Sequence, residues 1–168
     1  ILNRYETNND IKEAARICHK IGLRFMVDHI FDIPFENEKN IYESAQLYND
    51  IRPDIINCYN LLYFPRSKII EFALKAGNLK IYDVKKINQG KEIVYQTGEL
   101  NKDSSGSRNY YKKYALLLIL IPLFPSWLIK KILHDRKVLR FLESLPLILI
   151  PIVKVILDFK TGFGFIPF

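Results

Sequence analysis

The sequence has only two cysteines, Cys18 and Cys58, and they match no metal-ligand spacing. This excludes a metal site built from closely spaced cysteines within the chain. Free cysteine is among the most buried residue types, so we expect both to be core thiols of a protein from a reducing compartment.

The chain also lacks an initiator methionine and a charged-then-apolar leader with a small-residue cleavage site. The first residues, ILNRYETNND, begin in the middle of a sequence pattern. We therefore expect a fragment whose N-terminal part is missing. A long apolar run is absent too. Prolines interrupt the blocks Ala115–Ile129 and Leu145–Ile152, and each is shorter than the roughly 20 residues that a membrane span needs. We expect a cytoplasmic protein, with contact to the inner face of the membrane left open.

The composition fits a folded chain, with 49% hydrophobic and 26% charged residues. The net charge of +7 is unevenly distributed. Residues 1–77 carry ten Lys/Arg and eleven Asp/Glu, whereas residues 78–168 carry fifteen and seven. A basic half favours an anionic partner, nucleic acid or lipid, although a solvated basic face is the simpler alternative.

Hydrophobic periodicity and breakers predict an α/β fold. The expected order is a helix at 10–21, a strand at 23–33, a helix at 37–50, a strand at 54–63 and a helix from Ser67 to Gly77. The expected N-caps are Asn8 or Asn9, Asn37 and Ser67. The run LRFMVDHIFDI does not alternate cleanly, so we expect a strand of a parallel sheet covered on both faces.

Beyond Gly77 the composition of the sequence changes twice. Residues 78–109 read as an irregular segment and linker, and residues 110–168 as a helical, hydrophobic and basic extension. Residues 127–145 match one basic amphipathic helix, a type that lies in a bilayer interface. The alternative is a buried cap whose apolar blocks pack on protein.

The loop after the first strand carries acidic residues at a spacing of four, at Asp28, Asp32 and Glu36. In α/β sheets, ligands bind at the carboxyl ends of the strands, where this loop is expected. The simpler interpretation is that the acidic residues favour the N-terminus of the next helix.

The segment DHIFDIPFE (28–36) resembles the D-x-I-x-G-x-P-x-E signature of radical S-adenosylmethionine enzymes. The elements around it follow the family's order: Leu2 to Gly22, RPD (52–54), YFPRS (63–67) and the alanine-glycine stretch 73–77. The residues within these motifs are most similar to those of the cobalamin-binding branch. The resemblance covers about residues 1–90.

The resemblance implies that residues 1–77 are the C-terminal part of a partial (β/α) barrel. Such enzymes cleave S-adenosylmethionine at a 4Fe-4S cluster to make a 5′-deoxyadenosyl radical. The expected reaction is methylation or rearrangement at an unreactive C–H position of a small-molecule or lipid-like substrate. The implied cofactors are S-adenosylmethionine, the cluster and cobalamin.

The resemblance also assigns the adenine side of the cofactor site. Ile30 would pack on the adenine, and the loop Asp32, Ile33 and Pro34 would shape the pocket. The backbone from Asn60 to Leu62 would meet the adenine edge, with a plain core strand as the equal alternative.

The chain departs from the family pattern at several positions. Asp32, Phe35 and Arg66 stand where the family has glycine, and glycine permits close backbone approach. The CxxxCxxC motif is absent, so the cluster ligands and any cobalamin domain would lie upstream.

A non-catalytic peripheral membrane or scaffold module is the alternative function. Residues 110–168 carry nine Lys/Arg and three Asp/Glu, which motivates contact with anionic lipid. Nucleic acid is disfavoured as a partner, because the basic residues are interleaved with Leu and Ile rather than with exposed polar groups.

Overall fold

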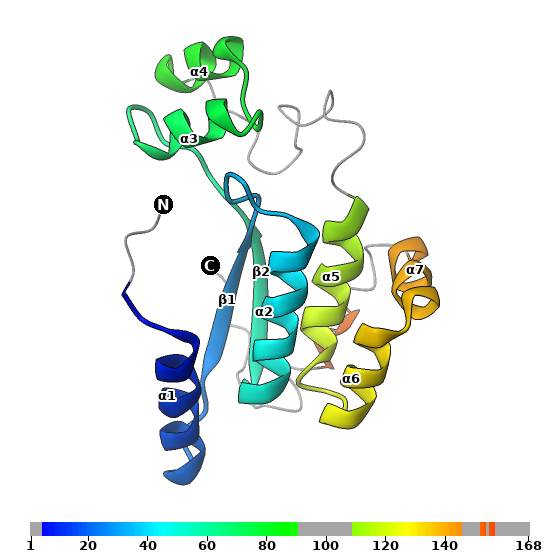
Figure 1. The fold of residues 1–168 in the computed structure, drawn as a ribbon. Helices are drawn as coiled ribbons and strands as arrows, with labels where there is room; N and C mark the ends of the chain where they lie inside the picture. Colours follow the sequence, from blue (N-terminus) through cyan, green and yellow to red (C-terminus); the bar gives the residue numbers. More distant parts are fainter. Residues whose placement is uncertain (1–4, 91–108, 146–151, 154, 157–168) are drawn as a thin grey trace.

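The computed structural model describes residues 5–90, 109–145, 152–153 and 155–156 (Figure 1). Within these ranges it is an α/β structure, as predicted, with two strands and seven helices. The elements are α1 (Asn8–Lys20), β1 (Met26–Phe31), α2 (Glu38–Ile51), β2 (Ile55–Asn60), α3 (Ile69–Lys75), α4 (Ile81–Asn88), α5 (Asn109–Leu120), α6 (Ser126–His134) and α7 (Arg136–Ser144).

The two strands form a parallel pair whose register runs from Met26 opposite Ile55 to Phe31 opposite Asn60. Helix α2 makes the crossover connection that parallel strands require. Helices α2 and α5 lie against the same side of this pair, and α6 and α7 pack outside them (Figure 1).

A single cluster of buried residues joins the strands to the C-terminal helices. Phe31 and Ile56 contribute from the strands, and Ile41 and Ala45 contribute from α2. The remaining members come from α5 to α7 and include Leu117, Leu118, Ile121, Ile129, Leu133, Leu139 and Leu142. Protein therefore covers Leu116, Leu117 and Leu118 of α5, and the cluster crosses the expected division at residue 109.

None of the helices in the described ranges combines the length and apolarity needed to cross a membrane. The second apolar block lies mostly outside those ranges.

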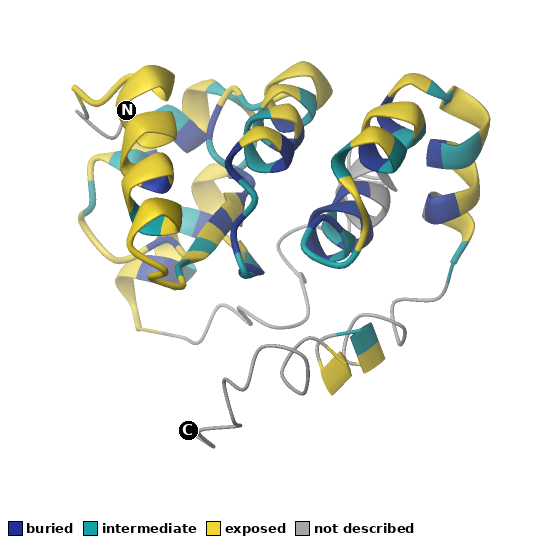
Figure 2. Cartoon of the chain, turned by 90° about the horizontal axis from the view of Figure 1, so that it is seen from below, coloured by how far each residue is buried: buried dark blue, intermediate teal, exposed yellow. Residues whose placement is uncertain are grey.

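Within the described part of the chain the other face of β1 is exposed, so the prediction of a strand covered on both faces is wrong. Along β1, His29 and Phe31 are buried, whereas Asp28 and Ile30 are exposed. This alternation along β1 is that of a strand packed on one side only. Figure 2 shows the chain coloured by burial.

Helix α1 packs against α2 and buries only Ala15. Lys12 pairs with Asp50 at 2.8 Å, and His19 Nε2 lies 2.8 Å from the Ile51 carbonyl oxygen. The apolar residues Ile11, Ile17 and Ile21 of this segment stay exposed.

Residues predicted to be irregular include a helix. α4 begins where the Asp83 carboxylate accepts a hydrogen bond from the Lys80 backbone N–H at 2.8 Å. α3 and α4 share a second cluster of buried residues that includes Tyr63, Ile70 and Ile87. This pair of helices lies beyond the carboxyl ends of the strands (Figure 1). Most of the expected linker, residues 91–108, lies outside the described residues.

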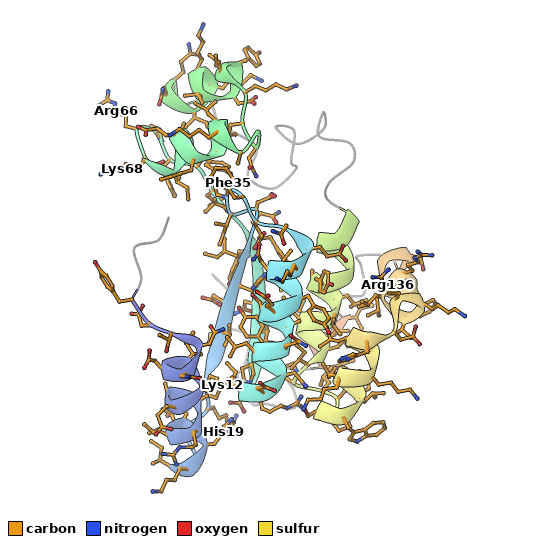
Figure 3. All side chains as sticks on the ribbon, viewed as in Figure 1. Lys12, His19, Phe35, Arg66, Lys68 and Arg136 are labelled. Atoms are coloured by element: carbon orange, nitrogen blue, oxygen red, sulfur yellow. The ribbon has the colours of Figure 1, made fainter. Side chains whose placement is uncertain are left out.

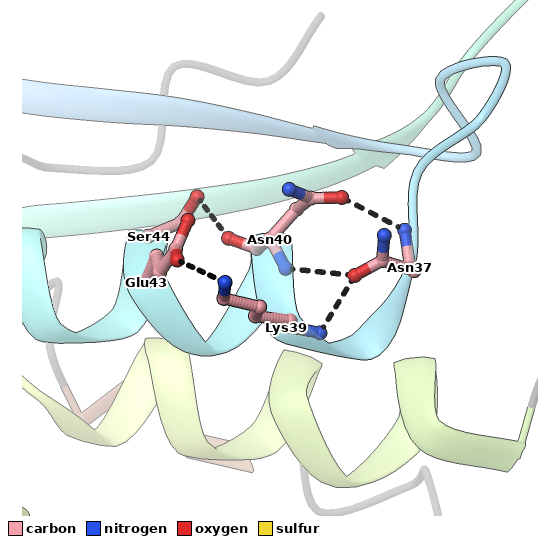
Figure 4. A network of polar contacts seen from close by, with 5 residues as sticks. All are labelled: Asn37, Lys39, Asn40, Glu43 and Ser44. Carbon is pink, nitrogen blue, oxygen red and sulfur yellow. Dashed lines mark hydrogen bonds and ion pairs between the residues drawn. The ribbon is translucent and has the colours of Figure 1, made fainter.

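The helix ends follow local capping chemistry, which differs in part from the prediction. Thr7 caps α1 in place of Asn8 or Asn9. Asn37 caps α2 as predicted, with its side-chain oxygen 3.0 Å from the Lys39 nitrogen and 3.3 Å from the Asn40 nitrogen (Figure 4).

Two further expectations about helix ends fail, one about a cap and one about the length of a helix. Ser67 does not cap α3, because its hydroxyl donates to the Phe64 carbonyl oxygen at 2.7 Å. The single helix expected at 127–145 is two helices, α6 and α7. Asp135 ends the first and caps the second, accepting from the Lys137 and Val138 nitrogens at 2.8 and 3.4 Å.

We expect Gly77→Ala to lower the free energy of unfolding by about 1 kcal/mol, through backbone strain alone. Gly77 has φ 75°, and a Cβ there would meet no atom within 4 Å. Urea unfolding would measure the change. Gly77→Asn is the matched control, because asparagine tolerates this conformation better and should lose less stability. Equal stability of Gly77→Ala and the unchanged chain would contradict the prediction.

Candidate functional site

The carboxyl ends of both strands meet at one edge, where the loops after β1 and β2 are joined. The Leu61 N–H donates to the Phe31 carbonyl oxygen at 2.9 Å. The Tyr63 hydroxyl donates to the Asp32 carbonyl oxygen at 3.4 Å. Figure 3 shows Phe35, Arg66 and Lys68 at this end of the molecule. These two loops and the adjoining open face of the sheet form the candidate site.

Each of the two loops contains a tight turn of the same kind. Ile33 to Glu36 and Phe64 to Ser67 are closed by hydrogen bonds of 2.9 and 3.2 Å between their end residues. Proline occupies the second position of each turn. Phe35 and Arg66 occupy the third, with φ values of 68° and 61°. This combination defines a type II turn, in which the third position favours glycine.

The backbone conformation at Asp32 also favours glycine. Its φ is 70°, and its N–H donates to the Glu36 carboxylate at 2.9 Å. Glu36 therefore folds back over the loop and stabilises it. The side chains of Asp32 and Pro34 are buried, and Ile33 is half-buried. These three residues shape the edge through their backbone rather than through an exposed side chain.

We expect Phe35→Gly to be about 1 kcal/mol more stable than Phe35→Ala, because only glycine adopts φ 68° without Cβ strain. Both variants lose the same exposed ring, so the comparison isolates the backbone term. Chemical denaturation of the two variants would measure it. If the alanine variant is equally stable, Phe35 is not strained.

Ile30 lies on the open face and not beneath a helix. Its side chain is 41% exposed, and its register partner Tyr59 is 51% exposed on the same face. One step back along the strands, the Asn57 side-chain amide donates to the Asp28 carboxylate at 3.1 Å. The face thus offers an apolar and aromatic surface next to a polar pair, a combination suited to a planar heterocycle.

The structure separates the predicted site residues into two groups. Ile30, Asn60 and Leu62 have exposed side chains near the carboxyl ends of the strands. The loop residues discussed above are buried or half-buried beside them. Tyr59 was not predicted, because its pairing with Ile30 depends on the register of strands 29 positions apart along the chain.

His29 points to the covered side of the sheet, away from the candidate site. It is 5% exposed, and its Nδ1 lies 3.0 Å from the Tyr48 hydroxyl. Burial lowers the pKa of His29 to about 4 and raises the pKa of Tyr48 to about 12. The neutral imidazole is therefore a core residue.

The described part of the chain has no group of three His, Cys, Asp or Glu side chains able to hold a metal ion. Cys18 is on α1 and Cys58 is on β2, both half-buried. Two thiols on separate elements do not fit a 4Fe-4S cluster.

Comparison with known proteins gave no matching family model, no matching curated protein and no matching solved structure.

Proposed function

We propose that this chain is the C-terminal portion of a radical S-adenosylmethionine enzyme of the cobalamin-binding type. In this proposal the β1–β2 pair belongs to a partial (β/α) barrel and carries the adenine side of the cofactor site. The cofactor, when bound at a cluster, supplies a radical for methylation or rearrangement at an unreactive C–H position.

Backbone conformation at three positions carries the proposal. Asp32, Phe35 and Arg66 stand where the family has glycine, and all three have positive φ. Only one other non-glycine residue within the described ranges, Arg52, has a positive φ. Non-glycine residues rarely adopt this conformation. The agreement therefore supports a backbone of the kind that the family's glycines favour, with other side chains on it.

The open surfaces of the chain also support this proposal. In a barrel, helices cover the outer face of the sheet and ligands meet the inner face at the carboxyl ends of the strands. Ile30 and Tyr59 lie on the face opposite α2 and α5. The exposed apolar side chains of α1 are surfaces that further β/α units would cover.

The chain's own residues would divide the binding of the adenine. Ile30 and Tyr59 would pack on the ring, and the backbone from Asn60 to Leu62 would meet its edge. The two type II turns would fix the position of this edge. The cluster does not fit the residues of this chain, so its ligands would have to come from elsewhere in the protein.

The full gene product, reconstituted with iron and sulfide, tests the proposal through formation of 5′-deoxyadenosine from S-adenosylmethionine. We expect Ile30→Ala to weaken S-adenosylmethionine binding about tenfold, by removing apolar contact with the adenine. Met26→Ala is the matched control, since Met26 is exposed on the same strand at its other end. A product that carries CxxxCxxC yet forms no 5′-deoxyadenosine would refute the assignment.

A peripheral membrane module is the second candidate function, and the surface of α6 and α7 supports it. Trp127 and Phe141 are 67% and 61% exposed, in helices that also carry Lys130, Lys131 and Lys137. Exposed aromatic and basic residues together are typical of an interfacial surface. Co-sedimentation with vesicles tests it: binding should require anionic lipid and should fall in Trp127→Ala/Phe141→Ala. If the chain does not bind vesicles even at low salt concentration, this function is excluded.

A further inference from the structure

A groove of about 610 Å³ lies among α2, α5, α6 and α7, away from the open face of the sheet. This volume is within the range of small-molecule binding sites. Its lining combines basic side chains with aromatic and aliphatic ones. Neither candidate function described above assigns it a role.

Three cationic side chains line the groove: Lys39 at the start of α2, and Arg136 and Arg140 on α7. Positions 136 and 140 are one helical turn apart, so both guanidinium groups project from one side of α7. Figure 3 shows Arg136 where α6 leads into α7. Among the residues described, neither arginine forms an ion pair or a side-chain hydrogen bond.

The lining holds three cationic side chains and one carboxylate, so its formal charge stays positive. Glu38, the acidic residue of the lining, accepts a hydrogen bond from the Tyr114 hydroxyl at 3.5 Å. Lys39 lies 3.8 Å from Glu43, and both side chains are mostly exposed (Figure 4). Such an exposed pair stabilises little, so Lys39 can turn to a ligand at low cost.

The rest of the lining consists of His134 and four apolar or aromatic residues, Tyr42, Tyr114, Leu133 and Leu139. Tyr114, Leu133 and Leu139 also belong to the main core cluster, so they are held in place by packing. A ligand that satisfies both parts of the groove has an anionic group and an apolar body.

We propose that this groove binds a phosphomonoester carried on an apolar body. Guanidinium groups bind phosphate oxygens through paired N–H donors, and two such groups with an ammonium match a dianion better than a single carboxylate. The apolar body would lie mainly on half-buried Tyr42 and on the small exposed edges of Tyr114, Leu133 and Leu139. The site does not depend on the proposed radical chemistry and would exist without it.

Calorimetric titration of the full chain with dihexanoyl phosphatidate, below its micelle concentration, tests the site. Inorganic phosphate and vesicles containing phosphatidate serve as separate arms for the free anion and the lipid surface. The test variant is Arg136→Ala/Arg140→Ala. The matched control is Lys130→Ala/Lys131→Ala, which removes the same charge from α6 outside the groove.

We expect the soluble phosphatidate to bind, and the arginine variant to weaken binding at least about tenfold. The lysine control should change it less than about threefold. Arg136→Lys/Arg140→Lys keeps the charge but removes the paired donors, and it should also weaken binding. This variant decides the question if the alanine variant does not fold.

Three results would overturn the site. In the first, the chain binds only vesicles, and both alanine variants weaken this binding equally. The contact would then belong to a general basic surface. Another is that inorganic phosphate binds as tightly as phosphatidate, since the apolar lining would then contribute nothing. The third is that the soluble phosphatidate does not bind.

Discussion

Leu118→Ala is expected to lower the free energy of unfolding by about 3 kcal/mol. Leu118 lies on α5 with no exposed surface, in the cluster that also holds Phe31 and Ile56 of the strands. Its removal would leave a cavity where the helical segment meets the sheet. The loss should therefore destabilise β1 and β2 as well as α5, because the three elements share one core.

Leu74→Ala is the matched control. Leu74 is also a leucine in a helix, but it is 37% exposed, so its truncation should cost below about 1 kcal/mol. Urea unfolding gives the two free energies, and hydrogen exchange of the β1 and β2 amides gives the location of the loss. If Leu118→Ala leaves strand protection unchanged, the C-terminal helices form an independent extension.

The order of helices and strands up to α3 could be predicted from the sequence because local signals define it. Asn37 caps α2, Pro53 follows its end, and Gly77 follows α3. The burial of α5 was left open, since apolar residues on all sides of a helix indicate burial in either protein or lipid. Only the packing of Leu117 and Leu118 against the strands decides between them.

The errors arise where two local preferences compete or where tertiary packing decides. The pattern of 127–145 fits one helix, but Asp135 prefers the capping position and divides it. The open face of the sheet could not be predicted, because periodicity does not say that α1 packs on α2 rather than over β1.

The position of the two loops at the carboxyl ends of the strands was predictable, but their turn conformation was not. The resemblance places the candidate site at the carboxyl ends of the strands, where the two joined loops are found. A proline shortly after each strand is a recognisable turn signal. The turn type is harder to recognise, because Phe35 and Arg66 occupy positions where glycine would have indicated a positive φ.

Acid should destabilise the fold through His29. Burial lowers its pKa to about 4 in the folded chain, against an ordinary value of 6.5. Between these values the unfolded chain binds a proton that the folded chain does not. Stability is therefore complete above the unfolded pKa and falls as the pH drops from about 6.5 toward 4, by roughly 3 kcal/mol in total.

His29→Gln should remove most of this pH dependence, since glutamine can keep a polar contact with Tyr48 but does not titrate. His134→Gln is the matched control, because it makes the same replacement at an exposed histidine at the end of α6. Urea unfolding at a series of pH values from 7 down to 4 would measure the three slopes. An unchanged slope in His29→Gln would mean that groups other than this buried imidazole cause the loss of stability in acid.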